Sequence, residues 1–125
     1  MKQFNAIVGI VNEEPDANGN IFTREALEKL DQQIVGKKVT YNFNPQMVIG
    51  VVDSAYRVGD SVIAEISVMD IPYHDKALFA VYGGVVDAME DIVETGGKKI
   101  TKFRANEISL TETPADQNPP PIKEL

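Results

Sequence analysis

Residues 99–116, which read KITKFRANEISLTETPAD, decide how the rest of the chain is interpreted. Lys99 to Leu110 and the earlier segment Gly84 to Met89 are predicted to be two strands. The turn sequence Glu94-Thr95-Gly96-Gly97 lies between them, and glycines in such a position favour a chain reversal. Working outward from this pair, the chain divides into further strand-length apolar segments and one helix.

Several other segments have the composition of strands. Phe4 to Val11 is rich in Ile and Val, which favour a buried strand. Lys38 to Phe43 is a predicted strand that should stop at the Asn-Pro pair after it, because proline cannot donate a ladder hydrogen bond. Val48 to Tyr56 and Ser61 to Met69 flank Arg57-Val58-Gly59-Asp60, and together they predict a hairpin. Along the second arm of this hairpin, apolar residues alternate with polar ones, so one face should be buried.

A helix is predicted between the first two strands. Thr23 can cap its amino end, with Glu25 in the first turn. Leu27, Leu30 and Ile34 then recur at helical spacing on one face. A glycine at position 36 is a plausible end of this helix.

These segments predict an α+β fold: a small, mainly antiparallel, β-barrel-like domain with one or two peripheral helices. Lys76 to Val81 fits a short helix or a strand equally well. A single domain is expected over residues 1–117, followed by a Pro-rich tail over residues 118–125 that should lie outside the core. The length of 125 residues suffices for one core and not for two.

The composition argues against several classes of function. A net charge of −7, from 19 acidic and 12 basic residues, disfavours nucleic-acid binding and favours a basic partner surface. The chain has no cysteine, so neither a disulfide nor a thiolate site is expected. Its apolar runs are too short for a membrane-spanning helix. No cofactor and no metal is predicted.

No set of residues forms a convincing catalytic site by pattern alone. The serines available as nucleophiles are Ser54, Ser61, Ser67 and Ser109. None of them has the glycine-rich surroundings of an activated serine, and the single histidine, His74, is interpreted as an exposed loop residue. Asp16 to Asn20 has its glycine at the wrong position for a calcium loop and is interpreted as a turn. Gly83-Gly84 and Gly96-Gly97 are interpreted as turns or as places of close strand packing.

Four segments, in the same order, resemble the prohead (capsid-maturation) serine proteases of tailed phages. Residues 99–116 are similar to that family's closing signature, ITKFELNEISLVDRPANP. Residues 7–27 are similar to its opening motif, G-x-(V/A)…D-x-x-G-D-x-(I/V)-T-P-E-A-(L/I). The segments VTYNFNP…IGVV (39–52) and VYGGVVDA (81–88) are similar to V-x-x-N-H-D…P-I-G-x-(V/A) and S-I-G-G-x-V-x-x-A. The resemblance covers about the whole chain.

This resemblance implies a herpesvirus-assemblin-like fold that lacks the family's catalytic residues. In the family, the His of N-H-D is the base and the Ser of S-I-G is the nucleophile. Matched residue by residue, these positions are Phe43 and Val81 here. Phenylalanine cannot accept a proton and valine cannot attack a carbonyl, so no catalytic residue is expected at this site.

The expected function is that of a non-catalytic structural protein of the phage virion, most simply a capsid decoration or auxiliary head protein. One alternative is an assembly-stage head factor that is absent from the mature particle. Another is an active maturation protease with a rearranged site that uses His74 and one of the serines. The expected location is the virion capsid, reached through the host cytoplasm during assembly.

The expected partners are the major capsid protein or other head proteins, and a homo-oligomer is left open. No nucleic-acid or membrane partner is expected. The residues predicted to contact the capsid are Asn118, Pro119, Pro120, Pro121 and Ile122. Simple disorder of this tail is an equally good interpretation of the sequence.

Overall fold

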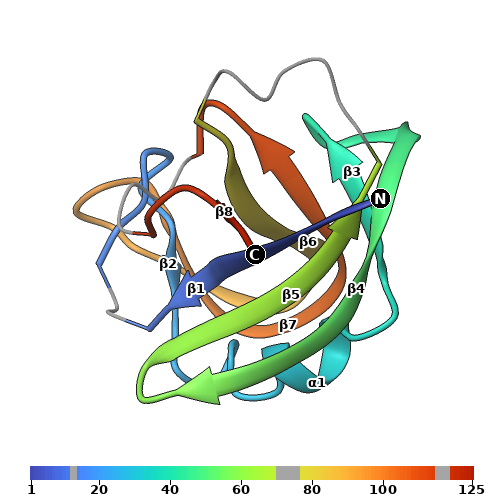
Figure 1. Ribbon diagram of the computed structural model, residues 1–125. Coiled ribbons are helices and arrows are strands. Elements are labelled where there is room, and N and C mark those ends of the chain that lie inside the picture. The colour runs from blue at the N-terminus through green and yellow to red at the C-terminus, as the bar shows by residue number, and fades with distance from the viewer. Residues whose placement is uncertain (12–13, 70–76, 115–118) are drawn as a thin grey trace.

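Strands dominate the computed structural model, which describes residues 1–11, 14–69, 77–114 and 119–125 (Figure 1). They hold 60% of the described residues, against 4% in helix. The strands are β1 (Lys2–Ile10), β2 (Ile21–Phe22), β3 (Lys38–Tyr41), β4 (Asn44–Val58), β5 (Ser61–Val68), β6 (Phe79–Asp91), β7 (Lys98–Thr111) and β8 (Lys123–Glu124). A single helix, α1 (Leu30–Ile34), is present in the described part of the chain.

The strands form one mixed, open sheet rather than the predicted antiparallel barrel. Its order is β2-β7-β3-β4-β5-β1-β8, and β6 pairs with the other edge of β7. β2 and β3 both run parallel to β7, which pattern reasoning about neighbouring segments did not anticipate. The prediction of an α+β, barrel-like fold with one or two peripheral helices is therefore wrong. Among the described strands, β6 and β8 lie at the two ends of the sheet.

The predicted helix is shorter in the structure than its sequence pattern suggested. The prediction that Thr23 caps the helix is wrong, because the N-cap of the observed helix is Lys29; Thr23 Oγ1 instead accepts a hydrogen bond from the N–H of Ala26, at 3.2 Å, within the turns that precede the helix. The carbonyls of Leu27 and Glu28, however, accept hydrogen bonds from the guanidinium of Arg57 on β4. Residues 24–29 form successive turns, and regular helix begins only at Leu30. The apolar residues of this segment are still buried, as their spacing predicted.

The predicted hairpin of β4 and β5 is confirmed. Val58 pairs with Ser61 across a two-residue turn, in which Gly59 has a φ of 59°. The alternating residues of β5 are buried on one face, as their period-two pattern predicted, and they are Val62, Ala64, Ile66 and Val68. The long hairpin of β6 and β7 is confirmed as well. Of the ambiguous segment Lys76 to Val81, residues 79–81 are strand, Ala77 and Leu78 precede it, and Lys76 lies outside the described residues.

Two details of the strand prediction are wrong. The strand predicted over Lys38 to Phe43 ends two residues earlier, at Tyr41, and Asn44-Pro45 does not break the strand pattern, because β4 begins at Asn44 and runs through Pro45. Proline is tolerated there because the β3–β4 register is irregular, jumping from Tyr41–Asn44 to Thr40–Val48. The chain reverses earlier, at Asn42-Phe43, as a two-residue turn.

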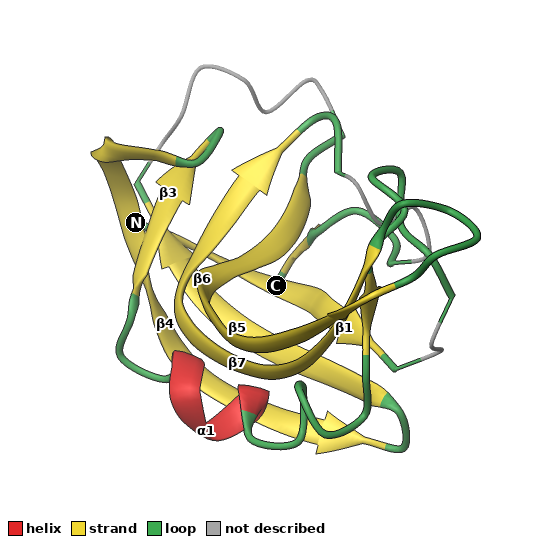
Figure 2. Ribbon diagram, turned by 180° about the vertical axis from the view of Figure 1, so that it is seen from behind, coloured by secondary structure: helices red, strands yellow, loops and turns green. Residues whose placement is uncertain are grey.

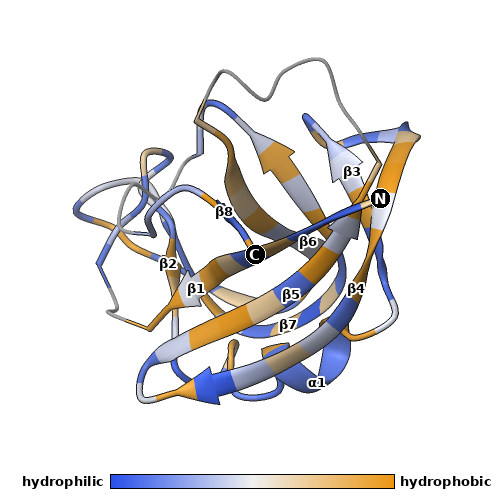
Figure 3. Cartoon of the chain, in the orientation of Figure 1, coloured by the Kyte–Doolittle hydropathy of each residue, from blue (hydrophilic) through white to orange (hydrophobic). Residues whose placement is uncertain are grey.

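The core fills the inside of the curved sheet, where inward residues of β1, β5 and β7 meet the apolar face around α1. α1 packs against β7 and β4 at one margin of the sheet (Figure 2). Alternating apolar and polar bands along β5 mark the two faces of the sheet (Figure 3). Phe22, Tyr82 and Phe103 pack edge to face, with ring centroids 5.2 to 5.5 Å apart. No described helix has the length and apolar character needed to span a membrane.

The carboxyl-terminal tail crosses the opening between β6 and β1. The N–H of Ile122 donates to the carbonyl of Leu78 at 2.9 Å, just before β6. β8 then pairs with Phe4 and Asn5 of β1. Ile122 also packs against the core and Pro119 is buried, so the expectation that this tail lies outside the core is wrong for these two residues, whereas the other described tail residues are exposed. Asn118 lies outside the described residues.

Candidate functional site

The two positions that the sequence resemblance assigns to a base and a nucleophile lie on either side of β7. β3 and β6 pair with opposite edges of this strand, so Thr40, Ser109 and Val81 form one row across three strands. Phe43 follows β3 and donates its backbone N–H to Ser109 Oγ at 2.7 Å. Both positions therefore meet at Ser109, although they are far apart in the sequence.

Phe43 has an unusual backbone conformation. Asn42 and Phe43 have φ values of 50° and 57°, the left-handed region that a two-residue hairpin turn requires at both central positions. Asparagine tolerates this conformation well, whereas a phenylalanine there is strained. The Phe43 side chain is 48% exposed, so burial does not explain the choice of residue.

We expect Phe43→Gly to unfold at a higher urea concentration than Phe43→Ala. Both variants lose the same aromatic contacts, but only glycine adopts the left-handed conformation without penalty, a gain of about 1 kcal/mol. Equilibrium urea unfolding of the two purified variants measures the difference. If Phe43→Ala is as stable as Phe43→Gly, the backbone at position 43 is not strained.

The row around Ser109 is rich in buried hydroxyls. Ser109 and Thr40 are fully buried, and Thr40 Oγ1 has no hydrogen-bond partner among the described residues. Val81 contributes an apolar side chain and Phe43 contributes a backbone amide. In this arrangement Ser109 acts as an acceptor that joins the β3–β4 turn to β7, and Phe43 and Val81 bring no group for proton transfer or nucleophilic attack.

Ser109→Ala is expected to destabilise the protein by about 1 to 3 kcal/mol, because the N–H of Phe43 would lose its acceptor in a partly buried setting. Amide hydrogen exchange at Phe43 should accelerate more than exchange in β5. A suitable control is Ser67→Ala, whose hydroxyl bonds Asp53 at the surface and whose loss should change stability by only about 0.5 kcal/mol. Equal effects of the two variants would exclude the proposed role of Ser109.

The other candidates from the sequence do not converge on this row. Ser54 donates to Glu65 at 3.2 Å, and Ser67 donates to Asp53, both between β4 and β5. Ser61 opens β5 at the hairpin turn. His74 lies outside the described residues, so its distance to any serine is not part of the described structure.

The loop before β2 is a turn, as its sequence predicted. Asp16 Oδ1 accepts hydrogen bonds from the backbone N–H groups of Asn18 and Asn20, at 2.9 and 3.0 Å. The carboxylate thus holds its own loop. Across residues 1–11, 14–69, 77–114 and 119–125, no three acidic or histidine side chains come together as metal ligands would.

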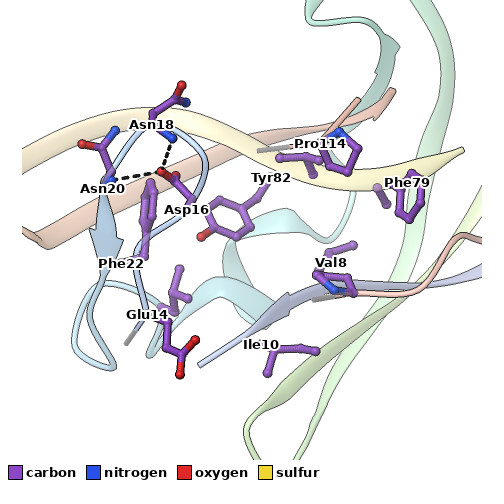
Figure 4. A pocket seen from close by; sticks show the side chains of 14 residues that line it. Val8, Ile10, Glu14, Asp16, Asn18, Asn20, Phe22, Phe79, Tyr82 and Pro114 are labelled. Atoms are coloured by element: carbon purple, nitrogen blue, oxygen red, sulfur yellow. Dashed lines mark hydrogen bonds between the residues drawn. The ribbon is translucent and has the colours of Figure 1, made fainter. Parts of the chain in front are cut away.

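A cavity of about 220 Å³ lies beside this loop, between β1, β2 and β6 (Figure 4). Its polar end is formed by Glu14, Asp16, Asn18 and Asn20. Its remaining wall is apolar and aromatic, and includes Val8, Ile10, Phe22, Leu27, Phe79, Ala80, Val81, Tyr82, Pro114 and Pro119. Val81 therefore belongs to the row around Ser109 and also lines this cavity.

The cavity was not foreseen from the sequence, because its lining comes from four separate segments. Pro119 was predicted as a capsid contact, yet here it is buried and lines the cavity. Pro120 and Pro121 are exposed. The density of turn residues at positions 14–20 was the one available signal, and it indicated a loop without indicating what the loop encloses.

The outer part of the β6–β7 hairpin carries a separate ion pair. Arg104 donates to both carboxylate oxygens of Asp87, at 2.7 and 3.0 Å. The hydrogen bonds from Arg104 lower the pKa of Asp87 and in turn raise the pKa of Arg104. This pair bridges a stretch where the β6–β7 register is irregular, and it takes no part in the cavity.

Comparisons of the chain with protein-family models, with curated proteins and with solved structures find no match.

Proposed function

We propose that this protein is a non-catalytic structural protein of a phage head, acting as a capsid decoration or auxiliary protein. The observation that carries the proposal is the pair Phe43 and Val81, which occupy the positions of base and nucleophile in four segments that resemble prohead proteases. The partners that follow from it are the major capsid protein or other head proteins.

The geometry around Ser109 supports this assignment of positions. Both positions contact the same residue, because the backbone N–H of Phe43 donates to Ser109 Oγ and Val81 pairs with Ser109 across the β6–β7 ladder. Their side chains offer neither a proton acceptor nor a nucleophile. Because these two positions lack the chemistry, we assign the protein a binding role and no role in cleavage at this site.

Quantitative mass spectrometry of purified mature virions of the encoding phage tests the proposal. Many intact copies per particle are expected, in a fixed ratio to the major capsid protein. Absence from the mature particle, with presence in immature heads, would instead indicate an assembly-stage factor.

A cleavage assay tests the alternative of a rearranged protease. Purified protein is incubated with immature heads, and the head proteins are followed by mass spectrometry. We expect no cleavage. Cleavage that disappears in the His74→Ala variant would overturn the proposal and assign a catalytic role to that histidine.

A further inference from the structure

We propose that the cavity between β1, β2 and β6 is a docking site for an extended segment of a partner protein, in which an apolar side chain stands next to Lys or Arg. The apolar side chain would enter the cavity and the cation would lie at its acidic end. This inference goes beyond the proposed function and does not depend on it, because it uses only the lining of the cavity.

The floor of the cavity suits an apolar group. Val8, Leu27 and Ala80 are each no more than 3% exposed, and the buried Pro119 adds to the same wall. A volume of about 220 Å³ corresponds to roughly seven water molecules at about 30 Å³ each. Water molecules next to such a wall make few hydrogen bonds, so their replacement by an apolar side chain lowers the free energy.

The mouth of the cavity suits a cation. Glu14 and Asp16 stand at one end, beside Phe22 and apart from Phe79 and Pro114 (Figure 4). Glu14 and Asn18 are exposed, so this end is open to solvent. A basic residue is complementary in charge to these two carboxylates, and the net charge of −7 adds long-range attraction.

The shape of the cavity favours a peptide over a compact ligand. Four consecutive residues of β6, Phe79 to Tyr82, line it, so residues from both faces of the strand contribute. The cavity therefore runs beside four consecutive residues of β6. Extended peptides bind along strand edges and place alternate side chains in neighbouring pockets, which gives them their specificity.

Three capped tetrapeptides test this chemistry by NMR titration of the purified chain. Ac-Ala-Leu-Arg-Ala-NH2 carries both features, Ac-Ala-Leu-Glu-Ala-NH2 reverses the charge, and Ac-Ala-Ala-Arg-Ala-NH2 removes the apolar group. We expect saturable shifts at Val8 and Ala80 with the first peptide. The charge-reversed peptide should bind about fivefold more weakly and the truncated one about tenfold more weakly. Equal binding of all three, or shifts elsewhere only, would overturn the proposal.

Matched variants locate the site. Asp16→Asn keeps an oxygen that can hold the loop turn but removes the charge, and Glu14→Gln does the same at the exposed rim. Each should weaken the Arg peptide by about two- to fivefold, whereas Glu90→Gln, at the other end of β6, should leave it unchanged. If the three variants Asp16→Asn, Glu14→Gln and Glu90→Gln bind the Arg peptide with the same affinity, Glu14 and Asp16 do not bind its cation.

Ala80→Leu fills the floor and should abolish binding. If that variant does not fold, Asp16→Asn and Glu14→Gln still test whether the peptide binds in this cavity. 3-Methylbutylamine serves as the small-molecule comparison, because it has the same apolar and cationic groups without a peptide backbone. Binding of this amine together with failure of the Arg peptide would show a site for free amines and overturn the partner-protein proposal.

Discussion

Gly84→Ala is expected to destabilise the protein by about 3 kcal/mol or more, the largest effect that we predict for the loss of a glycine. A Cβ atom at Gly84 would fall on the carbonyl oxygen of Arg104, and that atom belongs to the backbone of β7. It cannot move aside as a side chain can, so the β6–β7 ladder must separate locally. Urea unfolding followed by circular dichroism measures the loss.

The neighbouring glycine provides the control. A Cβ at Gly83 would meet Glu107, whose side-chain atoms lie 3.0 Å away and can rotate. Gly83→Ala should therefore change stability by only about 1 kcal/mol. If both substitutions are tolerated equally, the close approach of β6 to β7 is not as described here.

Ile108→Ala is expected to cost about 2 to 5 kcal/mol, because it deletes a large side chain from the centre of the sheet. Ile108 is fully buried and pairs in register with Val39 on one edge of β7 and with Tyr82 on the other. The cavity left by the substitution is surrounded by three strands that other contacts hold in place, so collapse can recover little of the loss.

Val93→Ala is the matched control for the loss of an aliphatic side chain. Val93 is 90% exposed, and its truncation should change the free energy of unfolding by no more than about 0.5 kcal/mol. Thermal unfolding of both variants reports the contrast. An Ile108→Ala variant within 1 kcal/mol of the parent would mean that the centre of β7 is not part of the core.

The strands with a clear local pattern were predictable. The alternation along β5 and the glycine at its hairpin turn are both local properties, and they identify the buried face without reference to any other segment. The interpretation of Gly83-Gly84 as close strand packing is confirmed at Gly84. The turn at Asn42-Phe43 was missed, because a phenylalanine stands where glycine normally signals such a turn.

The candidate sites depended much more on tertiary contacts. Ser109 was considered only as a poor nucleophile, and nothing local indicates that it accepts the N–H of Phe43. The cavity combines β1, the loop before β2, β6 and Pro119, which are separated by most of the chain. Distances between such segments are set by packing, and no sequence pattern within one segment contains them.

By itself, the sequence determined where the longer strands lie, which face of β5 is apolar, and that positions 43 and 81 carry no acid–base or nucleophilic group. These are properties of single residues and of their short-range periodicity. Only the tertiary structure decided that β3 runs parallel to β7, that the sheet stays open, and that Arg57 of β4 binds the carbonyls of Leu27 and Glu28. The physical reason is that hydrogen bonds and apolar contacts between distant segments compete with local preferences, and the outcome depends on how all segments pack together.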